Sequence, residues 1–223
     1  MDMEFSSERE MFELMEEKLN TAVICDILDD LGYRNQIMSS KIRPIDADYV
    51  IAGRAKTILA GDVYTQPDKP YESEIEAVDS ISENEIVVVA TNHSESNAFW
   101  GELLSTAAQV KGSRGAIIYG GTRDIKKIKD IHFKVFTSNL NPLDSKGRAI
   151  VLDYDCPIDC GGVMLHPGEI VFADYDGIVV IPKGVEDKVI DAALDKVSKE
   201  KCGLKDLGNG LSLRQVFDKY GIL

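Results

Sequence analysis

The chain has 223 residues, enough for one well-buried core, and 44% of them are hydrophobic, so an ordinary globular domain is expected over residues 1–223. Its 38 acidic residues outnumber its 25 basic ones and give a net charge of −13, which disfavours nucleic acid as a partner. No apolar run approaches the roughly 20 residues that span a bilayer, and residues 1–18 lack the basic start and apolar middle of a signal peptide, so a cytoplasmic protein without a membrane partner is expected.

Two amphipathic helices are predicted at the start of the chain. Apolar residues recur at helical spacing over residues 8–19 and again over residues 22–31. A serine or threonine hydroxyl commonly accepts a hydrogen bond from the first turn of a helix. We therefore expect Ser6 or Ser7 to cap the first helix and Thr21 to cap the second.

A mixed stretch follows these helices. Residues 35–49 contain the breaker Pro44 and have no regular pattern, so they are expected to be irregular. Alternation of apolar residues over 50–59 predicts a strand, and apolar residues spaced three apart over 75–81 predict a short helix. The β-branched run at 85–91 predicts a strand that is buried on both faces.

Residues 99–138 show a clear alternation of helix and strand. Helices are predicted over residues 99–112 and 123–131, and each is followed by a short apolar run that predicts a strand. These strands cover residues 115–121 and 134–138. Because consecutive parallel strands need a crossover between them, the alternation predicts a parallel sheet in an α/β fold.

The last part of the chain has a different pattern. Closely spaced β runs separated by Gly, Pro and Asp predict antiparallel hairpins or a small barrel. These runs are residues 148–158, 161–165, 168–174 and 177–182. Two helices, over residues 184–201 and 212–221, are expected to close the chain.

The cysteines and histidines do not form a recognisable metal-binding pattern. The cysteines include one C-x3-C pair but no C-x2-C pair, so buried free thiols are expected. They are Cys25, Cys156, Cys160 and Cys202. The histidines are scattered, and no histidine-based metal site is expected. They are His93, His132 and His166.

Two short segments at the ends of predicted strands are candidates for chemistry. In an open α/β sheet, ligands bind at the carboxyl ends of strands, beside the free N–H groups of the following helices. Gly101 lets a ligand approach such a helix start, which also carries Glu102. Arg123 can grip a carboxylate or enolate, and Asp124 can hold a hard cation. Twenty residues separate Glu102 from Arg123, which suits one helix plus one strand and predicts that both segments reach the same sheet edge.

Simpler explanations exist for each of these residues. Glu102 can serve only to complement a helix dipole, and Asp124 can serve only as a helix cap. Arg123 and Asp124 can also form no more than a surface ion pair. A structure distinguishes these explanations, because a shared site requires the two segments to lie side by side.

The acid, the 20-residue spacing and the Arg-Asp pair together resemble the signature of a known family. The similarity extends over about residues 20–182, through TAVICDILDDLG, NQIMSSKIRPI, AGRAKTI, WGELLSTAAQVKGSRGAIIYGGTRD, VFTSNLNPLDSKGR and CGGVMLHPGEIVFADYDGIVVIP. The family is that of the class II 4-hydroxy-4-methyl-2-oxoglutarate aldolases and the regulator of ribonuclease activity A.

The resemblance implies an α/β fold with layers of β, β and α, similar to the swivelling domain of phosphohistidine enzymes. It implies a core over about residues 20–182, preceded by an N-terminal helix and followed by C-terminal helices over residues 184–223. It also implies a homotrimer or homohexamer whose active sites lie at subunit interfaces.

Carried over residue by residue, the resemblance implies a role for each part of the site. Asp124 would bind Mg²⁺ or Mn²⁺, with water completing the coordination, and Arg123 would bind the keto acid and stabilise its enolate. The backbone amides of Leu103 and Leu104 would hold the pyruvate carboxylate. Glu102 would help to position water at the metal.

The implied activity is that of a divalent-metal-dependent lyase that cleaves 4-hydroxy-4-methyl-2-oxoglutarate-like 4-hydroxy-2-keto acids to pyruvate. Cleavage leaves a pyruvate enolate, whose charge a divalent cation and Arg123 can stabilise, so oxaloacetate decarboxylation is expected at the same site. The alternative within this family is a non-catalytic protein that binds and regulates a ribonuclease.

Two positions depart from the lyase pattern, and two further acids match family positions. Lys127 stands where the lyases have an auxiliary acid, and Tyr119 stands where many have an aspartate, as in the regulator branch. Asp124 favours the lyase, because the regulator branch loses this metal ligand. Glu200 matches an acid that a neighbouring subunit contributes in some lyases, and Asp26 matches an early acidic position.

Overall fold

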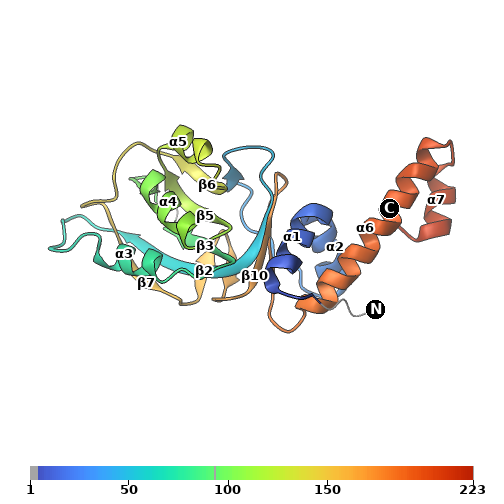
Figure 1. Cartoon of the computed structure of the whole chain (residues 1–223), viewed down its shortest axis with the longest axis horizontal. Coiled ribbons are helices and arrows are strands. Elements are labelled where there is room, and N and C mark those ends of the chain that lie inside the picture. Colours follow the sequence, from blue (N-terminus) through green and yellow to red (C-terminus); the bar gives the residue numbers. More distant parts are fainter. Residues whose placement is uncertain (1–4, 93, 223) are drawn as a thin grey trace.

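A twisted nine-stranded sheet forms the centre of the structure, a computed structural model that describes residues 5–92 and 94–222. Four neighbouring strands are parallel, in the order β6, β5, β3 and β2 (Figure 1). They are β2 (Ile51–Asp62), β3 (Glu85–Ala90), β5 (Gly115–Thr122) and β6 (Val135–Leu140). Their apolar runs are buried because both faces of the sheet are covered. The predicted parallel α/β arrangement is confirmed.

Shorter strands extend this sheet, mostly in antiparallel pairing. β10 (Ile170–Ala173) pairs with β2 and with β11 (Ile178–Ile181), and β7 (Ala149–Tyr154) pairs with the far end of β2. β1 (Arg43–Pro44) is antiparallel to β6, whereas β4 (Ala98–Trp100) is parallel to β5. The antiparallel pairing predicted for the last β runs is confirmed. The segment predicted to be irregular contains β1, because a sheet edge tolerates a proline.

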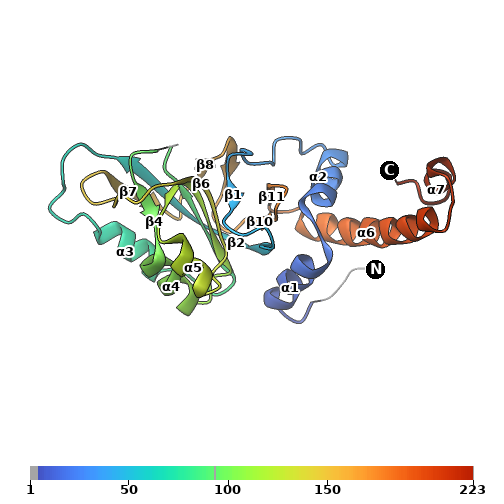
Figure 2. The same ribbon diagram turned by 90° about the horizontal axis from the view of Figure 1, so that it is seen from above.

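Helices cover one face of the sheet, and a small hairpin covers the other (Figure 2). The helices are α3 (Glu72–Asp79), α4 (Glu102–Val110) and α5 (Ile125–Asp130), whose buried apolar side chains pack on the central strands. The hairpin consists of β8 (Ile158–Cys160) and β9 (Val163–Leu165), which pack against the opposite face. The structure therefore has the predicted layers of β, β and α.

The remaining helices gather at one end of the sheet. α1 (Glu8–Lys18) and α2 (Thr21–Asp30) pack on β10 and β11 together with the first half of α6 (Glu186–Gly208). The second half of α6 extends away from the sheet and ends beside α7 (Leu213–Tyr220) (Figure 1). The predicted terminal helices are confirmed, and α6 continues beyond the predicted end at residue 201.

One of the two predicted N-terminal caps is correct. Ser7 caps α1 through its side chain. Thr21 does not cap α2, because Asn20 occupies that position and its Oδ1 accepts a hydrogen bond from the Val23 N–H at 2.9 Å. The Thr21 hydroxyl instead donates to Asp174 at 2.6 Å and ties α2 to the end of β10.

The segment before α4 differs from its prediction in a way that shapes the site. Residues 99–100 belong to β4 and not to the helix, because their aromatic side chains are buried against the sheet. The loop that leads into β4 crosses β5 closely at Gly121, where a Cβ atom would lie 2.3 Å from the Asn97 carbonyl oxygen. Glycine is therefore required for β4 to lie beside β5.

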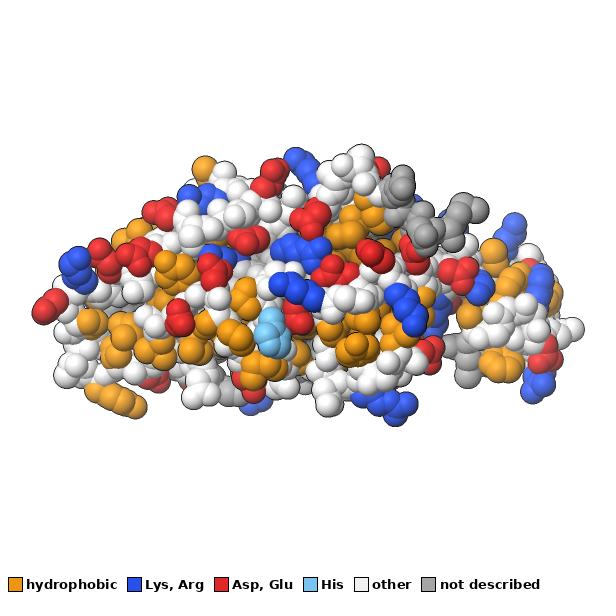
Figure 3. All heavy atoms as spheres, turned by 90° about the horizontal axis from the view of Figure 1, so that it is seen from below, with side chains coloured by type: hydrophobic (Ala, Val, Ile, Leu, Met, Phe, Trp, Pro, Cys, Tyr) orange, Lys and Arg blue, Asp and Glu red, His pale blue; other side chains and the backbone are white. Residues whose placement is uncertain are grey.

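The cysteine prediction is partly correct. Cys160 is buried, and all of the cysteines are free thiols, but Cys202 is exposed because it lies on the part of α6 that extends from the sheet. His93 lies outside the described residues. Within residues 5–92 and 94–222, none of the helices could span a lipid bilayer. Acidic and basic side chains are interspersed over the face shown in Figure 3.

Candidate active site

A cavity of about 310 Å³, lined by charged and apolar side chains, opens at the carboxyl ends of β4 and β5. Its walls come from β4, the start of α4, the residues after β5, α3 and the loop between β6 and β7. It is lined by the residues that the sequence analysis placed in the substrate and metal sites: Gly101, Glu102, Leu103, Leu104, Arg123 and Asp124. The two predicted segments therefore lie side by side.

Pairing of β4 with β5 brings these segments together. Trp100 lies opposite Thr122 in this parallel pair, and the Arg123 N–H donates to the Trp100 carbonyl at 2.9 Å. The chain enters α4 shortly after Trp100 and enters α5 directly after Asp124. One sheet edge thus fixes the backbone on both sides of the cavity.

The Asp124 carboxylate faces α4 and does not cap α5. Asp124 has a left-handed backbone, with φ of 60°, which aspartate tolerates better than most residues. Within the described residues its side chain makes no capping bond to α5, whereas its Oδ2 accepts a hydrogen bond from the Glu102 N–H at 3.3 Å. Asp124 therefore stands at the N-cap position of α5, but its side chain does not cap that helix and bonds to the start of α4 instead.

Arg123 lies between two carboxylates. Its Nε is 3.7 Å from Asp124 Oδ2, and its Nη1 is 3.3 Å from Asp144 Oδ1. The Tyr71 hydroxyl donates to Asp144 Oδ2 at 2.6 Å and holds that carboxylate from the start of α3. Arg123 and Asp124 are thus more than an isolated surface pair, because the guanidinium belongs to a row of contacts along the cavity wall.

The charges along this row favour an ionised Asp144. Burial opposes ionisation, but the Tyr71 hydrogen bond and the positive charge of Arg123 outweigh it and hold the pKa of Asp144 below its ordinary value. The same hydrogen bond raises the pKa of Tyr71 to about 12. Asp144 is therefore a carboxylate at neutral pH, and it orients Arg123.

Lys127 forms an ion pair with Glu102 that the sequence did not predict. It extends from α5, and its Nζ lies 2.8 Å from Glu102 Oε2. The hydrogen bond from Lys127 to Glu102, together with the charge of Glu102, raises the pKa of Lys127. At the position of the expected auxiliary acid, this chain therefore places a cation that engages Glu102.

The first turn of α4 offers backbone donors to the cavity. Its first intrahelical hydrogen bond runs from the Ser105 N–H to the Gly101 carbonyl at 3.0 Å. The N–H groups of Leu103 and Leu104 consequently have no acceptor inside the helix. They lie at the positive end of the helix dipole, where a carboxylate binds favourably.

Glu74 is a buried acid of the cavity wall that the sequence analysis missed. It lies on α3 and is 9% exposed. Burial, together with the negative charge of Asp144, raises the pKa of Glu74 to about 7, against the opposing effects of Arg123 and a hydrogen bond with Ser145. Glu74 therefore exchanges a proton near neutral pH.

The raised pKa of Glu74 predicts a pH-dependent stability. Between its ordinary pKa of 4.5 and its folded pKa of about 7, the folded state keeps a proton that the unfolded state has released. Stability therefore falls as pH rises through this window. Glu74→Gln removes this loss, so we expect it to stabilise the fold on the order of 2 kcal/mol more at pH 8 than at pH 5. Urea unfolding at both pH values checks this, and an equal effect at both would contradict it.

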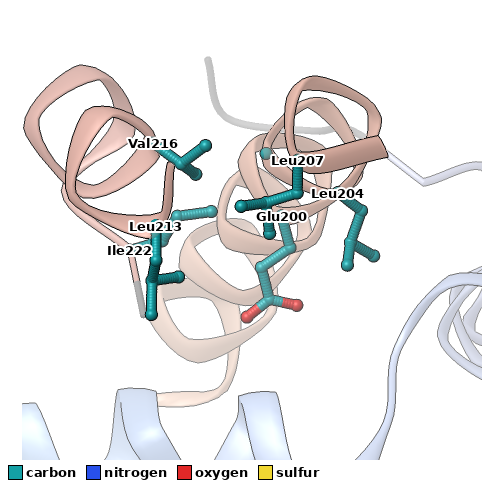
Figure 4. A pocket seen from close by; sticks show the side chains of 7 residues that line it. Glu200, Leu204, Leu207, Leu213, Val216 and Ile222 are labelled. Carbon is teal, nitrogen blue, oxygen red and sulfur yellow. The ribbon is translucent and has the colours of Figure 1, made fainter. Parts of the chain in front are cut away.

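Two other predicted acids do not reach this cavity within one chain. Asp26 lies on α2, and its carboxylate is 2.6 Å from Lys196 Nζ of α6. Glu200 lies where α6 and α7 enclose an apolar cavity of about 210 Å³ (Figure 4). Both helices stand at the opposite end of the molecule from α3 and α4 (Figure 1). Any contact of Glu200 with the site would have to come from another subunit.

The remaining site predictions concern Tyr119 and the metal. Tyr119 is buried on β5, in the core between the main sheet and the β8–β9 hairpin. Among the described residues, no group of three or more His, Cys, Asp or Glu side chains is arranged to hold a metal ion. A cation at this cavity would therefore depend on Asp124, as the resemblance implies, together with water.

The motifs that form this site lie within a segment that matches a single family model. The model, RraA-like (Aldolase/RraA), matches residues 21–180. The chain belongs to the RraA-like family. The matched segment contains the strands of the central sheet and the two segments that line the cavity, which are the start of α4 and the residues after β5. Helices α1, α6 and α7 lie outside it.

Proteins similar to this chain carry different names. Protein DlpA of Legionella pneumophila is 26% identical over 204 residues, which cover 90% of this chain and 32% of that protein. The chain thus spans about a third of the length of DlpA. A protein of Halalkalibacterium halodurans named "Putative 4-hydroxy-4-methyl-2-oxoglutarate aldolase" is 28% identical, over 89% of this chain and 90% of that protein.

A solved structure confirms the fold. RraAS2 of Streptomyces coelicolor, described as an unusual member of the RNase ES inhibitor RraA protein family, superposes with a TM-score of 0.76. The superposition covers 89% of this chain and 98% of that chain, at 22% identity.

Proposed function

We propose that the chain is a divalent-metal-dependent lyase that cleaves 4-hydroxy-4-methyl-2-oxoglutarate-like 4-hydroxy-2-keto acids to pyruvate. We extend the proposal to oxaloacetate decarboxylation, because both reactions pass through a pyruvate enolate. The observation that carries it is the meeting of Arg123, Asp124 and the start of α4 in one cavity. Membership of the RraA-like family and similarity to a protein named as an aldolase support it.

The cavity offers separate partners for the two charged parts of such a substrate. The N–H groups of Leu103 and Leu104 would bind the carboxylate next to the keto group. The guanidinium of Arg123 would stabilise the negative charge that develops on the enolate oxygen. Because Asp144 already orients this guanidinium, little reorganisation is needed when the charge forms.

Asp124 would hold Mg²⁺ or Mn²⁺. Hard cations prefer oxygen ligands, and the Asp124 carboxylate lies at the cavity with 36% of its side chain exposed. When bound, the cation supplies a Lewis acid that stabilises the enolate. Glu102 would help to position water at the metal, in competition with its ion pair to Lys127.

Removing the Lys127 cation is expected to strengthen metal binding. Lys127→Ala frees Glu102 from its ion pair and takes a positive charge away from the metal site. We expect the Mn²⁺ dissociation constant, measured by calorimetry, to fall roughly tenfold, since groups outside the first ligand shell change metal affinity by about 10 to 100-fold. Lys126→Ala, an exposed neighbour on α5, is the control. Unchanged or weaker binding by Lys127→Ala would count against this role.

A side chain at Gly101 would press against the two charged residues of the site. A Cβ atom there would lie 3.0 Å from Asp124 Oδ2 and 3.2 Å from Arg123 Cγ. We expect Gly101→Ala to displace both side chains and to lower kcat/KM for pyruvate release about a hundredfold, because small misplacements in a site have effects of this size. Gly177→Ala, whose Cβ would meet no atom within 4 Å, is the control, and equal activity of both variants would contradict the expectation.

We further propose that the active protein is a homotrimer or homohexamer with sites at subunit interfaces. Leu103 is a large apolar side chain at the cavity mouth with 81% of its surface exposed, which suits contact with a neighbouring subunit. In such an assembly, Glu200 of one subunit would approach the cavity of the next. Light scattering of the purified protein measures the assembly, and a monomer would contradict the proposal.

A protein-binding regulator of ribonuclease activity is the competing function. Tyr119 favours it, because this position resembles the regulator branch, whereas Asp124 favours the lyase. The regulator would bind a ribonuclease scaffold tightly whether or not a chelator is present. A pull-down that recovers no ribonuclease would contradict this alternative.

A coupled pyruvate-release assay across a panel of 2-keto acids tests the lyase. The panel contains 4-hydroxy-4-methyl-2-oxoglutarate, oxaloacetate and 4-hydroxy-2-keto acids that lack the distal carboxylate. We expect turnover of the first two with Mg²⁺ or Mn²⁺, and the third group shows whether that carboxylate is recognised. Absence of turnover on the whole panel would overturn the lyase.

A further inference from the structure

The cavity contains an acid that the proposed function does not yet use. Glu74 lies in the first turn of α3, on the wall that faces the start of α4, and its side chain is buried. Among the described residues it forms no salt bridge, although Arg123 and Asp144 both lie close enough to influence its charge. Burial of a carboxyl group without a direct counter-ion destabilises its ionised form. At neutral pH the ionised and the protonated forms of Glu74 therefore have similar free energies.

The surroundings of Glu74 come from several elements and carry both signs of charge. Asp144 and burial favour the protonated form, whereas Arg123 and the hydrogen bond with Ser145 favour the carboxylate. The other titratable groups that line the cavity are Tyr71, Glu102, Arg123, Asp124 and Asp144. Of these, Asp144 is held ionised and the pKa of Tyr71 is raised to about 12, so neither exchanges protons near neutral pH. Glu74 has a pKa of about 7, which is suited to general acid and base catalysis.

We propose that Glu74 carries the proton between the substrate hydroxyl group and the enolate carbon, an inference that rests on the proposed lyase function. In the retro-aldol reaction, the Glu74 carboxylate accepts the proton of the 4-hydroxyl group while the C3–C4 bond breaks. The electron pair of that bond becomes the enolate, and C4 becomes the carbonyl carbon of the leaving product. Protonated Glu74 then donates to C3, which completes the methyl group of pyruvate and restores the carboxylate.

The same group serves the decarboxylation of oxaloacetate. There the C3–C4 bond breaks to release carbon dioxide, its electron pair forms the enolate, and protonated Glu74 donates to C3. The proton is replaced from water. In the reverse direction, the Glu74 carboxylate removes a methyl proton from bound pyruvate, so the protein should exchange the methyl protons of pyruvate with solvent.

This exchange gives a test that does not depend on which keto acid is the natural substrate. Wild type, Glu74→Gln and the control Glu76→Gln, an exposed acid on the same helix, are incubated with pyruvate and Mn²⁺ in D₂O. Mass spectrometry of the pyruvate, after removal of the protein and metal, measures deuterium uptake. We expect Glu74→Gln to lower the exchange rate about a hundredfold, the smaller of the effects usual for general acid–base groups, and Glu76→Gln to leave it unchanged.

The pH dependence supplies a second measurement that needs no folded variant. Wild-type exchange requires the carboxylate, so its rate should rise with pH and level off above about pH 7. Suppose that the wild type both exchanges protons and releases pyruvate, and that folded Glu74→Gln exchanges protons as fast as the wild type. This result would overturn the role of Glu74 and leave the proposed lyase function intact. A wild-type rate that does not change with pH would also overturn it. If the wild type neither exchanges protons nor releases pyruvate from any keto acid, both proposals fall.

Discussion

Replacing Asp124 with Asn is expected to abolish tight Mn²⁺ binding and to lower pyruvate release about a hundredfold or more. The amide keeps the size of the side chain and an oxygen that can accept the Glu102 N–H hydrogen bond, but it lacks the charge that holds a divalent cation. Lewis-acid stabilisation of the enolate contributes several kcal/mol, and each 1.4 kcal/mol is about tenfold in rate. Calorimetry with Mn²⁺ and the coupled pyruvate assay measure the two losses.

Asp130→Asn is the matched control, because this exposed acid lies on α5 at its other end. It should bind Mn²⁺ and release pyruvate as the wild type does. If Asp124→Asn keeps the metal affinity of the wild type, Asp124 is not the ligand and the metal site lies elsewhere.

Replacing Arg123 with Lys is expected to lower kcat about a hundredfold while the Mn²⁺ affinity changes by no more than a few-fold. A lysine ammonium keeps the charge but cannot grip two oxygens in a plane, and it loses the geometry of the contact with Asp144. Loss of one preorganised donor to a developing oxyanion typically costs about 10² to 10³ in kcat. Steady-state kinetics with oxaloacetate provide the measurement.

Arg34→Lys, an exchange at an exposed loop position, is the control for Arg123→Lys. A change in KM with an unaltered kcat for Arg123→Lys would show that Arg123 binds the substrate without stabilising the enolate. That outcome would contradict the role proposed for the guanidinium.

The half of the site that local sequence patterns encode was predictable. One helix and one strand lie between Glu102 and Asp124, and the number of residues between them fits these two elements. This fit predicted that both residues lie at the same sheet edge. The short strand β4 was not predicted, because Phe99 and Trp100 continue the apolar pattern of the following helix. The prediction placed the start of α4 and the residues after β5 at the same sheet edge. Because β4 pairs directly with β5, these two segments lie side by side.

The other half of the site depends on long-range packing and could not be predicted. Tyr71 and Glu74 lie at the start of α3, which precedes β3 and β4 in the chain, and Asp144 lies in the loop between β6 and β7, where the sequence pattern indicated no contact with Arg123. They meet Arg123 because α3 packs over the sheet and the hydroxyl of Tyr71 reaches across to Asp144. Glu74 directly precedes the helix predicted over residues 75–81, and a single charged residue there indicates a solvent-facing side chain, whereas the tertiary fold buries it.

Lys127 adds to the site a charge contact that the sequence did not predict. From the sequence alone, Lys127 was notable only because it stands where the lyases have an auxiliary acid. In the structure, Lys127 on α5 forms an ion pair with Glu102 at the start of α4. The backbone donors of Leu103 and Leu104 do not depend on this pair. Under the proposed function, the expected consequence is that Lys127 weakens metal binding at Asp124 and leaves these backbone donors available to the substrate.

The decisive experiment for a metal-dependent lyase is pyruvate release by the wild-type protein before and after removal of divalent metal. We expect pyruvate from oxaloacetate and from 4-hydroxy-4-methyl-2-oxoglutarate with Mn²⁺, loss of both activities above the uncatalysed rate after chelation, and recovery when Mn²⁺ is restored. Pyruvate release that persists unchanged after complete chelation, or its absence with either substrate in the presence of Mn²⁺, would show that the protein is not a metal-dependent lyase of these keto acids.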